Sequence, residues 1–399
     1  MAIPLKAYFV DFKGKTIWGT LLPISIAAYL FFSMISISVS QIFLTFLFIF
    51  WLIMLIKEKQ RFTFPSFFWP IIAYVALSLV SVAFSVDPKL SLKDSKELLL
   101  FLIIPLIYTS FTHETALKKA NIALLASASI TCFYSLGYFI FKASTGESAC
   151  GFMGQCMTQA GLLLLFGCMA LSMFLFSRER MRYLWGLAFL LSLFALALTY
   201  IRSSWIGVVI AASLILLLYK PKALIIVPFA LGLIFLISPQ TIKKRALSIF
   251  DMKHPSNRER IEFMAAGIKI IKDYPLFGTG PDTVDIVFQN PKYNLSEAAK
   301  KNVHLHNNIL QTAAERGIPT LCAWLTFIGM VLISLLKLLK NKDPALRLFS
   351  VAALAALTGH FIAGLFEYNF ADSEITTLFL YLITIPFSLA RLQEKGATE

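Results

Sequence analysis

Charged side chains are scarce in this sequence of 399 residues, because only 15% of them are Asp, Glu, Lys or Arg whereas 58% are hydrophobic. A soluble domain carries about 25% charged residues. Stretches of alternating polar and apolar residues, which the strands of a membrane barrel need, are also lacking. A cleavable signal peptide is not expected, because the first apolar run follows a short segment with Lys6, Lys13 and Lys15. The low share of charged residues and the lack of alternating stretches predict an all-α polytopic membrane protein.

The sequence instead contains apolar runs of about 17–25 residues, the length with which a helix crosses a bilayer core of about 30 Å. They predict about twelve transmembrane helices, nine in the region 1–238 and three in the region 317–399, which ends in a cytoplasmic tail. The polar segment 239–316 between them is predicted to be a loop that contains helices. The expected spans are 17–35, 40–56, 66–84, 97–111, 117–141, 158–176, 183–200, 203–219, 222–238, 319–339, 345–366 and 375–391.

Basic residues give the chain a net charge of +14. In a soluble protein this charge would suggest nucleic acid as a partner, but here it is interpreted as topology signals and anchors to lipid headgroups, and no nucleic acid is expected. Lys and Arg are abundant in every second connection and sparse in the others. This alternation predicts that both termini are cytoplasmic and that segment 239–316 lies outside. The basic residues of the short outer loops are Lys89, Lys93, Lys96, Lys142 and Arg202.

Cysteine is rare as well, with five residues in the chain. Cys150 and Cys156 share one polar loop and would pair if that loop faces an oxidising compartment. The alternative is that they are small buried hydrophobic residues. The sequence leaves this choice open.

One helix is predicted inside segment 239–316. Ser256 and Glu259 have the spacing of a capping box, and Tyr274-Pro275 would end the helix. An apolar stripe at helical spacing would lie on the membrane surface or pack on the ends of the spans. Its members are Ile261, Met264, Ile268 and Ile271.

A second helix is predicted over 302–313, with a stop at Gly317 and a new start at Pro319. On a helix, His304 and His306 would point about 200° apart, so only one of them would face a site. On a strand both would share a face and could bind a metal. The helix is favoured, and a metal is not expected because no other cluster in the sequence has ligand spacing.

Three arginines are candidates for binding an anion. Arg202 lies in a tight outer turn between two spans, where it would either bind an anion or reach to the headgroups. Arg258 and Arg260 are predicted in the first turn of the helix that starts near Ser256, where positive charge opposes the helix dipole. Their alternative partners are Glu259 and Glu262 in the same turn. Arginine suits phosphate because its planar fork donates two parallel hydrogen bonds.

The connection between the last two spans carries Glu367 and Asp372. These carboxylates are candidates for neutralising Arg202 or orienting a histidine. The alternative is a solvated turn.

Taken together, five short motifs resemble the O-antigen ligase/polymerase superfamily. They are the tight turn at Arg202, the run Asn257-Arg-Glu-Arg-Ile-Glu-Phe, the turn Gly278-Thr-Gly-Pro, the run His304-Leu-His-Asn-Asn-Ile-Leu-Gln, and the segment 364–374. The order and spacing of the motifs carry the resemblance, which extends to the span layout of nearly the whole chain.

The resemblance implies a GT-C-like bundle in the bacterial inner membrane with its active site facing the periplasm. It implies transfer of a glycan from undecaprenyl pyrophosphate to a sugar of the lipid A core, inverting, without metal or other cofactor. The family's pyrophosphate-binding arginines correspond to Arg202 and Arg260, and its essential histidine corresponds to His306. Residues expected around these are Arg258, His304, Asn307, Glu367 and Asp372.

Three other functions remain open, one of which is a scaffold for other envelope enzymes that would need no convergence of these residues. A polymerase of the same superfamily would use a second polyprenyl-linked glycan as its acceptor, although chain length, span number and the doubled histidine favour a ligase. A transporter of an anionic solute would place charges or broken helices near the middle of the membrane, whereas the notable charges here are predicted at one surface. Convergence of Arg202, Arg260 and His306 on one cavity would favour interfacial chemistry.

Overall fold

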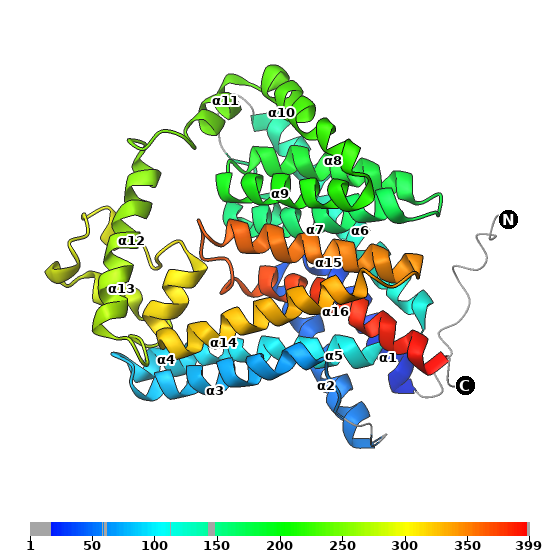
Figure 1. Cartoon of the computed structure of the whole chain (residues 1–399), viewed down its shortest axis with the longest axis horizontal. Coiled ribbons are helices and arrows are strands. Elements are labelled where there is room, and N and C mark those ends of the chain that lie inside the picture. Colours follow the sequence, from blue (N-terminus) through cyan, green and yellow to red (C-terminus); the bar gives the residue numbers. More distant parts are fainter. Residues whose placement is uncertain (1–16, 58, 60–61, 112, 143–147, 397–399) are drawn as a thin grey trace.

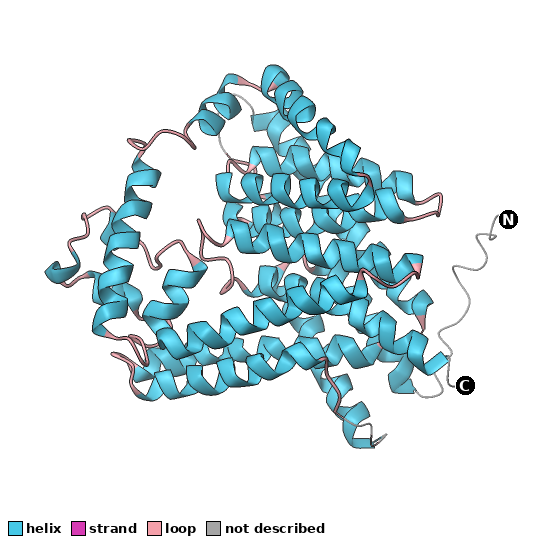
Figure 2. Ribbon diagram, viewed as in Figure 1, coloured by secondary structure: helices cyan, strands magenta, loops and turns pink. Residues whose placement is uncertain are grey.

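The computed structural model describes residues 17–57, 59, 62–111, 113–142 and 148–396. The described part is helical, with no strand in it (Figure 2). Lys6, Lys13 and Lys15 lie outside it. The helices are α1 (Ile17–Phe32), α2 (Ile37–Lys57), η2 (Ser66–Phe68), α3 (Trp69–Ala83), α4 (Pro88–Asp94), η3 (Ser95–Leu102), α5 (Ile103–Ser110), α6 (Glu114–Lys142), η5 (Gly151–Met153), α7 (Cys156–Phe176), α8 (Arg182–Leu198), α9 (Arg202–Tyr219), η6 (Pro221–Ile225), α10 (Ile226–Ile237), α11 (Gln240–Leu247), α12 (Pro255–Asp273), α13 (Val284–Phe288), η7 (Pro291–Tyr293), η8 (Ala299–Lys301), α14 (Asn308–Leu338), α15 (Pro344–Ala363) and α16 (Ser373–Gly396).

The prediction of an all-α polytopic membrane protein is supported. Within the described residues, eight helices are long and apolar enough to cross a membrane: α2, η2 with α3, α6, α7, α9, α14, α15 and α16. Three further apolar helices are shorter, namely Leu21–Phe32, Arg182–Leu198 and Pro221–Ile237. The run expected at 97–111 is divided between η3 and α5. Each predicted span therefore coincides with helix, while the number twelve stays a prediction.

The centre of the bundle is formed by α7, α15 and α16, whose spans are 78%, 72% and 78% buried. Small residues bring α9 close to α15, because a Cβ atom on Gly207 would lie 2.7 Å from the carbonyl oxygen of Gly359. Glycine contacts of this kind let membrane helices approach closely. This packing fixes the start of α9 and the end of α15, where Arg202 and the loop carrying Glu367 lie.

The segment from α11 to α13 lies at one end of the bundle, and the last turn of α16 lies at the other (Figure 1). The segment from α12 to the start of α14 has a hydrophobic cluster of its own, separate from the core of the bundle. Phe263 of α12, Phe288 of α13 and Leu305 are buried in this cluster. The cluster holds α12 and the histidine motif in place at one end of the bundle.

The start of α12 differs from the prediction. His254 is the N-cap residue and makes no side-chain cap, so the capping box at Ser256 and Glu259 is wrong. Pro255 is the first helical residue, so Arg258 is the fourth residue and completes the first turn as predicted, whereas Arg260 lies in the second turn. The hydroxyl of Ser256 instead accepts a hydrogen bond from Arg202. The predicted end at Tyr274 is confirmed.

Three of the four residues of the predicted apolar stripe on α12 face outward, whereas Ile271 packs against the cluster that contains Phe263. Ile261, Met264 and Ile268 are 43%, 51% and 45% exposed, whereas Phe263, Ala266, Gly267 and Ile270 form the buried face. The exposure of these three side chains agrees with a location on the membrane surface. It excludes the other predicted location, packing on the ends of the spans.

The break at Gly317 is confirmed, because this residue has φ 82° and ψ 165° within α14. Pro319 then begins the membrane-spanning part. The start of the preceding helix was placed too early, since it begins at Asn308 with Asn307 as the N-cap. His304 and His306 therefore precede the helix.

Candidate active site

A cavity of about 310 Å³ lies at the end of the bundle near α11 and α12. Arg202 at the start of α9, Arg260 on α12 and His306 before α14 all line it. The cavity also has apolar walls, to which Ile206 of α9 and Phe366 contribute. It is therefore a site with cationic groups, a histidine and an apolar surface together.

The segment before α14 directs both motif histidines to one side. Leu305 between them is 2% exposed and belongs to the cluster beneath α12, and its amide donates to Gln311 Oε1 at 2.6 Å. The two imidazole rings lie 4.2 Å apart between centroids. Only His306 is among the residues that line the cavity, so the expectation that one histidine faces the site is confirmed. The helix from which it was argued is absent there, because α14 begins at Asn308.

His306 is held by two polar side chains. Its Nδ1 atom lies 2.8 Å from Glu367 Oε1, and its Nε2 atom lies 3.3 Å from Asn302 Oδ1. The carboxylate accepts the Nδ1 proton, which leaves Nε2 of the neutral ring as the basic nitrogen. His306 also has φ 51°, a left-handed conformation that costs a non-glycine residue free energy and is enriched at functional sites.

Asn307 and Asn308 fasten the histidine segment to the loop that carries Glu367. Asn307 Nδ2 donates to the carbonyl of Leu365 at 2.8 Å, and the Asn308 amide donates to the carbonyl of Gly364 at 2.7 Å. The Asn308 side chain also accepts from the amide of Asn369 at 3.1 Å. These contacts bring Glu367 within reach of His306 across 61 residues of sequence. Asn307 was expected at the site, whereas the role of Asn308 in docking this loop was missed.

Arg260 links α12 to the same loop. Its Nε donates to the carbonyl of Phe366 at 2.9 Å, and its Nη2 lies 3.5 Å from Glu367 Oε2. The alternative partners Glu259 and Glu262 are not the ones that Arg260 uses. The Arg260 side chain is 27% exposed and that of Glu367 is 6% exposed, so the pair forms a partly desolvated wall of the cavity.

Arg202 is 8% exposed and does not reach for headgroups. Its Nη1 donates to the carbonyl and hydroxyl of Ser248 at 2.7 and 3.1 Å. Its Nη2 donates to Ser256 Oγ at 2.6 Å and to Asn257 Oδ1 at 2.7 Å. The guanidinium therefore anchors the connection from α11 to α12 while its charge stays at the cavity wall.

Arg245 on α11 also lines the cavity and was missed. Its Nε donates to the carbonyl of Tyr200 at 3.0 Å, next to the Arg202 turn. In sequence it is the last residue of the basic run Lys243-Lys244-Arg245, which does not distinguish it from its neighbours. Only the orientation of α11 selects it.

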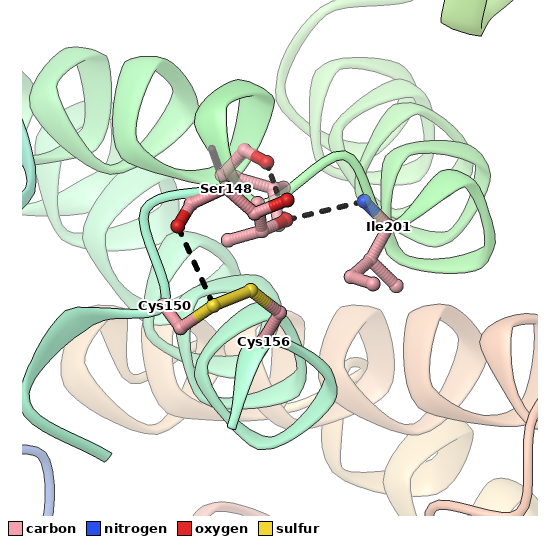
Figure 3. Close-up of a disulfide and its surroundings, with 6 residues drawn as sticks. Ser148, Cys150, Cys156 and Ile201 are labelled. Atoms are coloured by element: carbon pink, nitrogen blue, oxygen red, sulfur yellow. Dashed lines mark hydrogen bonds between the residues drawn. A yellow bond between two sulfur atoms is a disulfide. The ribbon is translucent and has the colours of Figure 1, made fainter. Parts of the chain in front are cut away.

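A disulfide between Cys150 and Cys156 lies beside the Arg202 turn, whose Ile201 is labelled in Figure 3. The amide of Ala149 donates to the carbonyl of Leu198 at 3.0 Å, which joins this loop to the end of α8. Cys156 begins α7, and the next residue, Met157, lines the cavity. Of the two alternatives for these cysteines, the structure has the pair. Cys132, Cys168 and Cys322 are free.

The electrostatic environment is set by burial and by the arginines. Burial is the main cause that lowers the pKa of His304 to about 4, and His306 contributes. Burial favours a raised pKa for Glu367, but the hydrogen bond from His306 and the nearby positive groups outweigh it and hold that pKa below its usual value. Burial first and Arg260 second lower the pKa of Arg245. The site thus favours a neutral His304, an ionised Glu367 and a bound anion.

His304, His306 and Glu367 offer one ligand atom each within 4.8 Å of one another, so the expectation that no ligand cluster exists is wrong. The sequence concealed it because Glu367 lies 61 residues after His306. Two features disfavour a divalent cation there. Glu367 already contacts Arg260 and His306, and three arginines add positive charge to the same cavity.

Two expected residues lie away from the cavity. Arg258 is exposed on α12 and does not line it. Asp372 accepts hydrogen bonds from the hydroxyl of Thr158 and, at 3.2 Å, from the amide of Ile375 at the start of α16. Its contacts are those of a residue that joins α16 to α7.

The family match falls on this region. Residues 187–325 match the family model described as O-Antigen ligase. This part of the chain is therefore similar to the O-antigen ligase family. The matched range includes Arg202, Arg245, Arg260 and both motif histidines, and it ends before Glu367. The resemblance predicted from the motifs is confirmed.

A relative of this chain occurs in Haemophilus influenzae and is described as an uncharacterized protein. It is 26% identical over 313 residues, which is 71% of this chain and 75% of that protein. Members of the superfamily are glycosyltransferase-like membrane enzymes with polysaccharide or lipid-linked substrates.

Proposed function

We propose that this protein is an O-antigen ligase, which transfers a glycan from undecaprenyl pyrophosphate to a sugar of the lipid A core at the periplasmic face of the inner membrane. The observation that carries the proposal is the single cavity that His306 shares with three arginines. A diphosphate leaving group requires cationic hydrogen-bond donors, and an attacking hydroxyl requires a base. The cavity contains both.

His306 is the proposed base. The acceptor hydroxyl attacks the anomeric carbon of the glycan, and its proton passes to His306 Nε2. The new bond joins the acceptor oxygen to that carbon, and the carbon–oxygen bond to the diphosphate breaks with its electron pair on the diphosphate. Attack opposite the leaving group inverts the anomeric centre. Glu367, 2.8 Å from Nδ1, stabilises the resulting imidazolium, and Asn302 Oδ1 can accept from Nε2–H once it is protonated.

Arg202 and Arg260 are the proposed pyrophosphate-binding residues. Both place positive charge on the cavity wall, which stabilises the charge that develops on the leaving group. The apolar residues of the cavity, among them Ile206 and Phe366, suit the first isoprene units of the donor. Arg202 has the additional role of holding the α11–α12 connection by its four hydrogen bonds.

Orientation is part of the proposal. The disulfide between Cys150 and Cys156 lies at the same end as the cavity, and disulfides persist in oxidising compartments such as the periplasm. The pattern of Lys and Arg in the connections favours the same orientation. Both observations support a site that faces the periplasm.

A reconstituted assay tests the proposal. The purified protein in nanodiscs receives an undecaprenyl-pyrophosphate glycan together with either lipid A core or a second molecule of the donor. A ligase produces glycosylated lipid A core. Lengthened polyprenyl-linked glycan instead would establish a polymerase, and no transfer to either acceptor would reject the glycosyltransferase assignment.

The control variants are His306→Ala and His113→Ala. The first should lose transfer while it still inserts in the membrane, and the second should keep it because His113 is exposed and does not line the cavity. A parallel reaction contains EDTA. Transfer should persist in it, whereas a loss that zinc reverses would assign a metal to His304, His306 and Glu367.

A further inference from the structure

Arg245 differs from the other cavity arginines in the donors that it has available. An arginine has five N–H donors. In the described part of the chain Arg245 uses one of them, from Nε to the carbonyl of Tyr200, and neither Nη atom has a hydrogen-bond acceptor or a carboxylate partner. Four N–H groups of a half-buried guanidinium therefore remain for something that occupies the cavity.

Arg202 and Arg260 have fewer donors to offer. Both Nη atoms of Arg202 are bonded to Ser248, Ser256 and Asn257. Arg260 donates from Nε to Phe366 and from Nη1 to Ser256, and its Nη2 lies beside Glu367. A ligand would have to break these contacts to gain a bidentate contact with either residue.

The anchor at Tyr200 prepares the Arg245 fork for a ligand. Tyr200 has φ 56°, and the donation from Arg245 Nε to its carbonyl restrains the side chain. A fork held in one orientation loses little conformational freedom when it binds. Its free face can donate two parallel hydrogen bonds to a phosphate group.

We infer that Arg245 makes a direct contact with the diphosphate of a lipid-linked donor, in addition to the contacts proposed for Arg202 and Arg260. The inference rests on the proposed function. It adds a third binding residue, on α11, to the two that the proposed function names.

Binding of a short isoprenoid diphosphate tests this inference. Farnesyl diphosphate and farnesyl monophosphate are titrated into the full-length protein in nanodiscs. Arg245→Met should weaken the diphosphate about 10- to 100-fold, because two charge-assisted hydrogen bonds are lost. Lys244→Met is the matched control, because Lys244 is the exposed neighbour on α11 and the substitution removes the same charge. The affinity of this variant for farnesyl diphosphate should stay within about twofold of wild type.

Arg245→Gln separates a ligand contact from a structural role. Glutamine keeps an amide donor for the Tyr200 carbonyl but lacks the charged fork. If Arg245 acts only by holding the Arg202 turn, Arg245→Gln should restore farnesyl diphosphate binding and thermal stability together. If Arg245 contacts the diphosphate, Arg245→Gln should keep stability and still bind weakly. Unchanged affinity in both variants would overturn the inference.

The same titrations distinguish a failure of the proposed function from a failure of the Arg245 contact alone. Wild-type protein that binds farnesyl diphosphate no better than the monophosphate would contradict diphosphate recognition as a whole, and the inference with it. His306→Ala should keep the affinity of wild type because the histidine acts on the acceptor. Strong binding by wild type and His306→Ala, with unchanged binding by Arg245→Met, would reject the Arg245 contact alone.

Discussion

At the scale of single residues, the candidate site depends on pairs that are distant in sequence. Glu367 contacts His306 through Oε1 and Arg260 through Oε2. One carboxylate therefore orients the proposed base and joins it to the cationic wall. A carboxylate in this position fixes the tautomer of a histidine and stabilises its protonated form.

Glu367→Gln should lower kcat for transfer by about 100-fold or more, because the neutral amide does not stabilise the imidazolium. The measurement is the initial rate in the nanodisc assay. Asp372→Asn is the control from the same connection, since Asp372 lies away from the cavity, and it should retain most of the activity. Equal losses in both variants would contradict the special role of Glu367.

Arg202→Lys should reduce kcat/KM about tenfold or more, although the charge is kept. A single ammonium group cannot reach Ser248 on one side and Ser256 with Asn257 on the other, so the α11–α12 connection loses its anchor. Arg347→Lys serves as the control, because Arg347 donates to Leu218 at the far end of α9. Wild-type rates in Arg202→Lys would show that the fork is unnecessary.

His304 should make the folded protein sensitive to acid. Its pKa in the fold is about 4 against an ordinary value of 6.5, so the unfolded chain binds a proton between these values that the folded chain does not. Stability is therefore complete above about pH 6.5 and is lost as the pH falls towards 4, by up to about 2 kcal/mol at pH 5. Thermal unfolding at pH 7.5 and pH 5 should show a smaller decrease for His304→Gln than for wild type, and equal decreases would exclude His304.

At the scale of elements, helix ends decide the site. Gly317 interrupts α14, which lets the segment Asn308–Arg316 take a direction different from that of the span after Pro319. The start of this segment then docks on the loop after α15. Gly364 makes that approach possible, since a Cβ atom there would lie 2.1 Å from Asn308 Nδ2.

Gly364→Ala should destabilise the protein by about 1–3 kcal/mol and reduce transfer, because the loop that carries Glu367 must shift away from Asn308. Gly137→Ala is the control, since a Cβ atom on Gly137 of α6 meets nothing within 4 Å and alanine favours a helix. The comparison uses the thermal midpoint and the transfer rate. A Gly364→Ala variant as active and stable as Gly137→Ala would contradict the close approach.

At the scale of the whole molecule, the cavity that contains Arg202, Arg260 and His306 lies at the end of the bundle where the disulfide lies. The central helices α7, α15 and α16 are mostly buried, whereas the notable polar groups gather at the ends of α9, α12 and α15. This distribution agrees with chemistry at the level of the headgroups and gives no support to a transport path through the middle of the membrane.

Orientation in the membrane can be measured with the cysteines. In a Cys322→Ser background, a membrane-impermeant maleimide should label Cys150 and Cys156 in spheroplasts only after brief reduction, because the disulfide faces outward and protects them. Cys132 and Cys168 should stay unlabelled because they are buried. Labelling without reduction would contradict the pairing, and labelling only after lysis would place the site on the cytoplasmic side.

Composition and periodicity by themselves determined that the chain is an all-α membrane protein, because a helix is the arrangement that satisfies the backbone of long apolar runs in lipid. The motifs also predicted the similarity to the O-antigen ligase family, which the match over 187–325 supports, and the break at Gly317. The tertiary structure decided the start of α12, the direction of both histidines, the partnership of Glu367 with His306, and the position of Arg245. Each of these depends on contacts between segments distant in sequence, which local spacing does not encode.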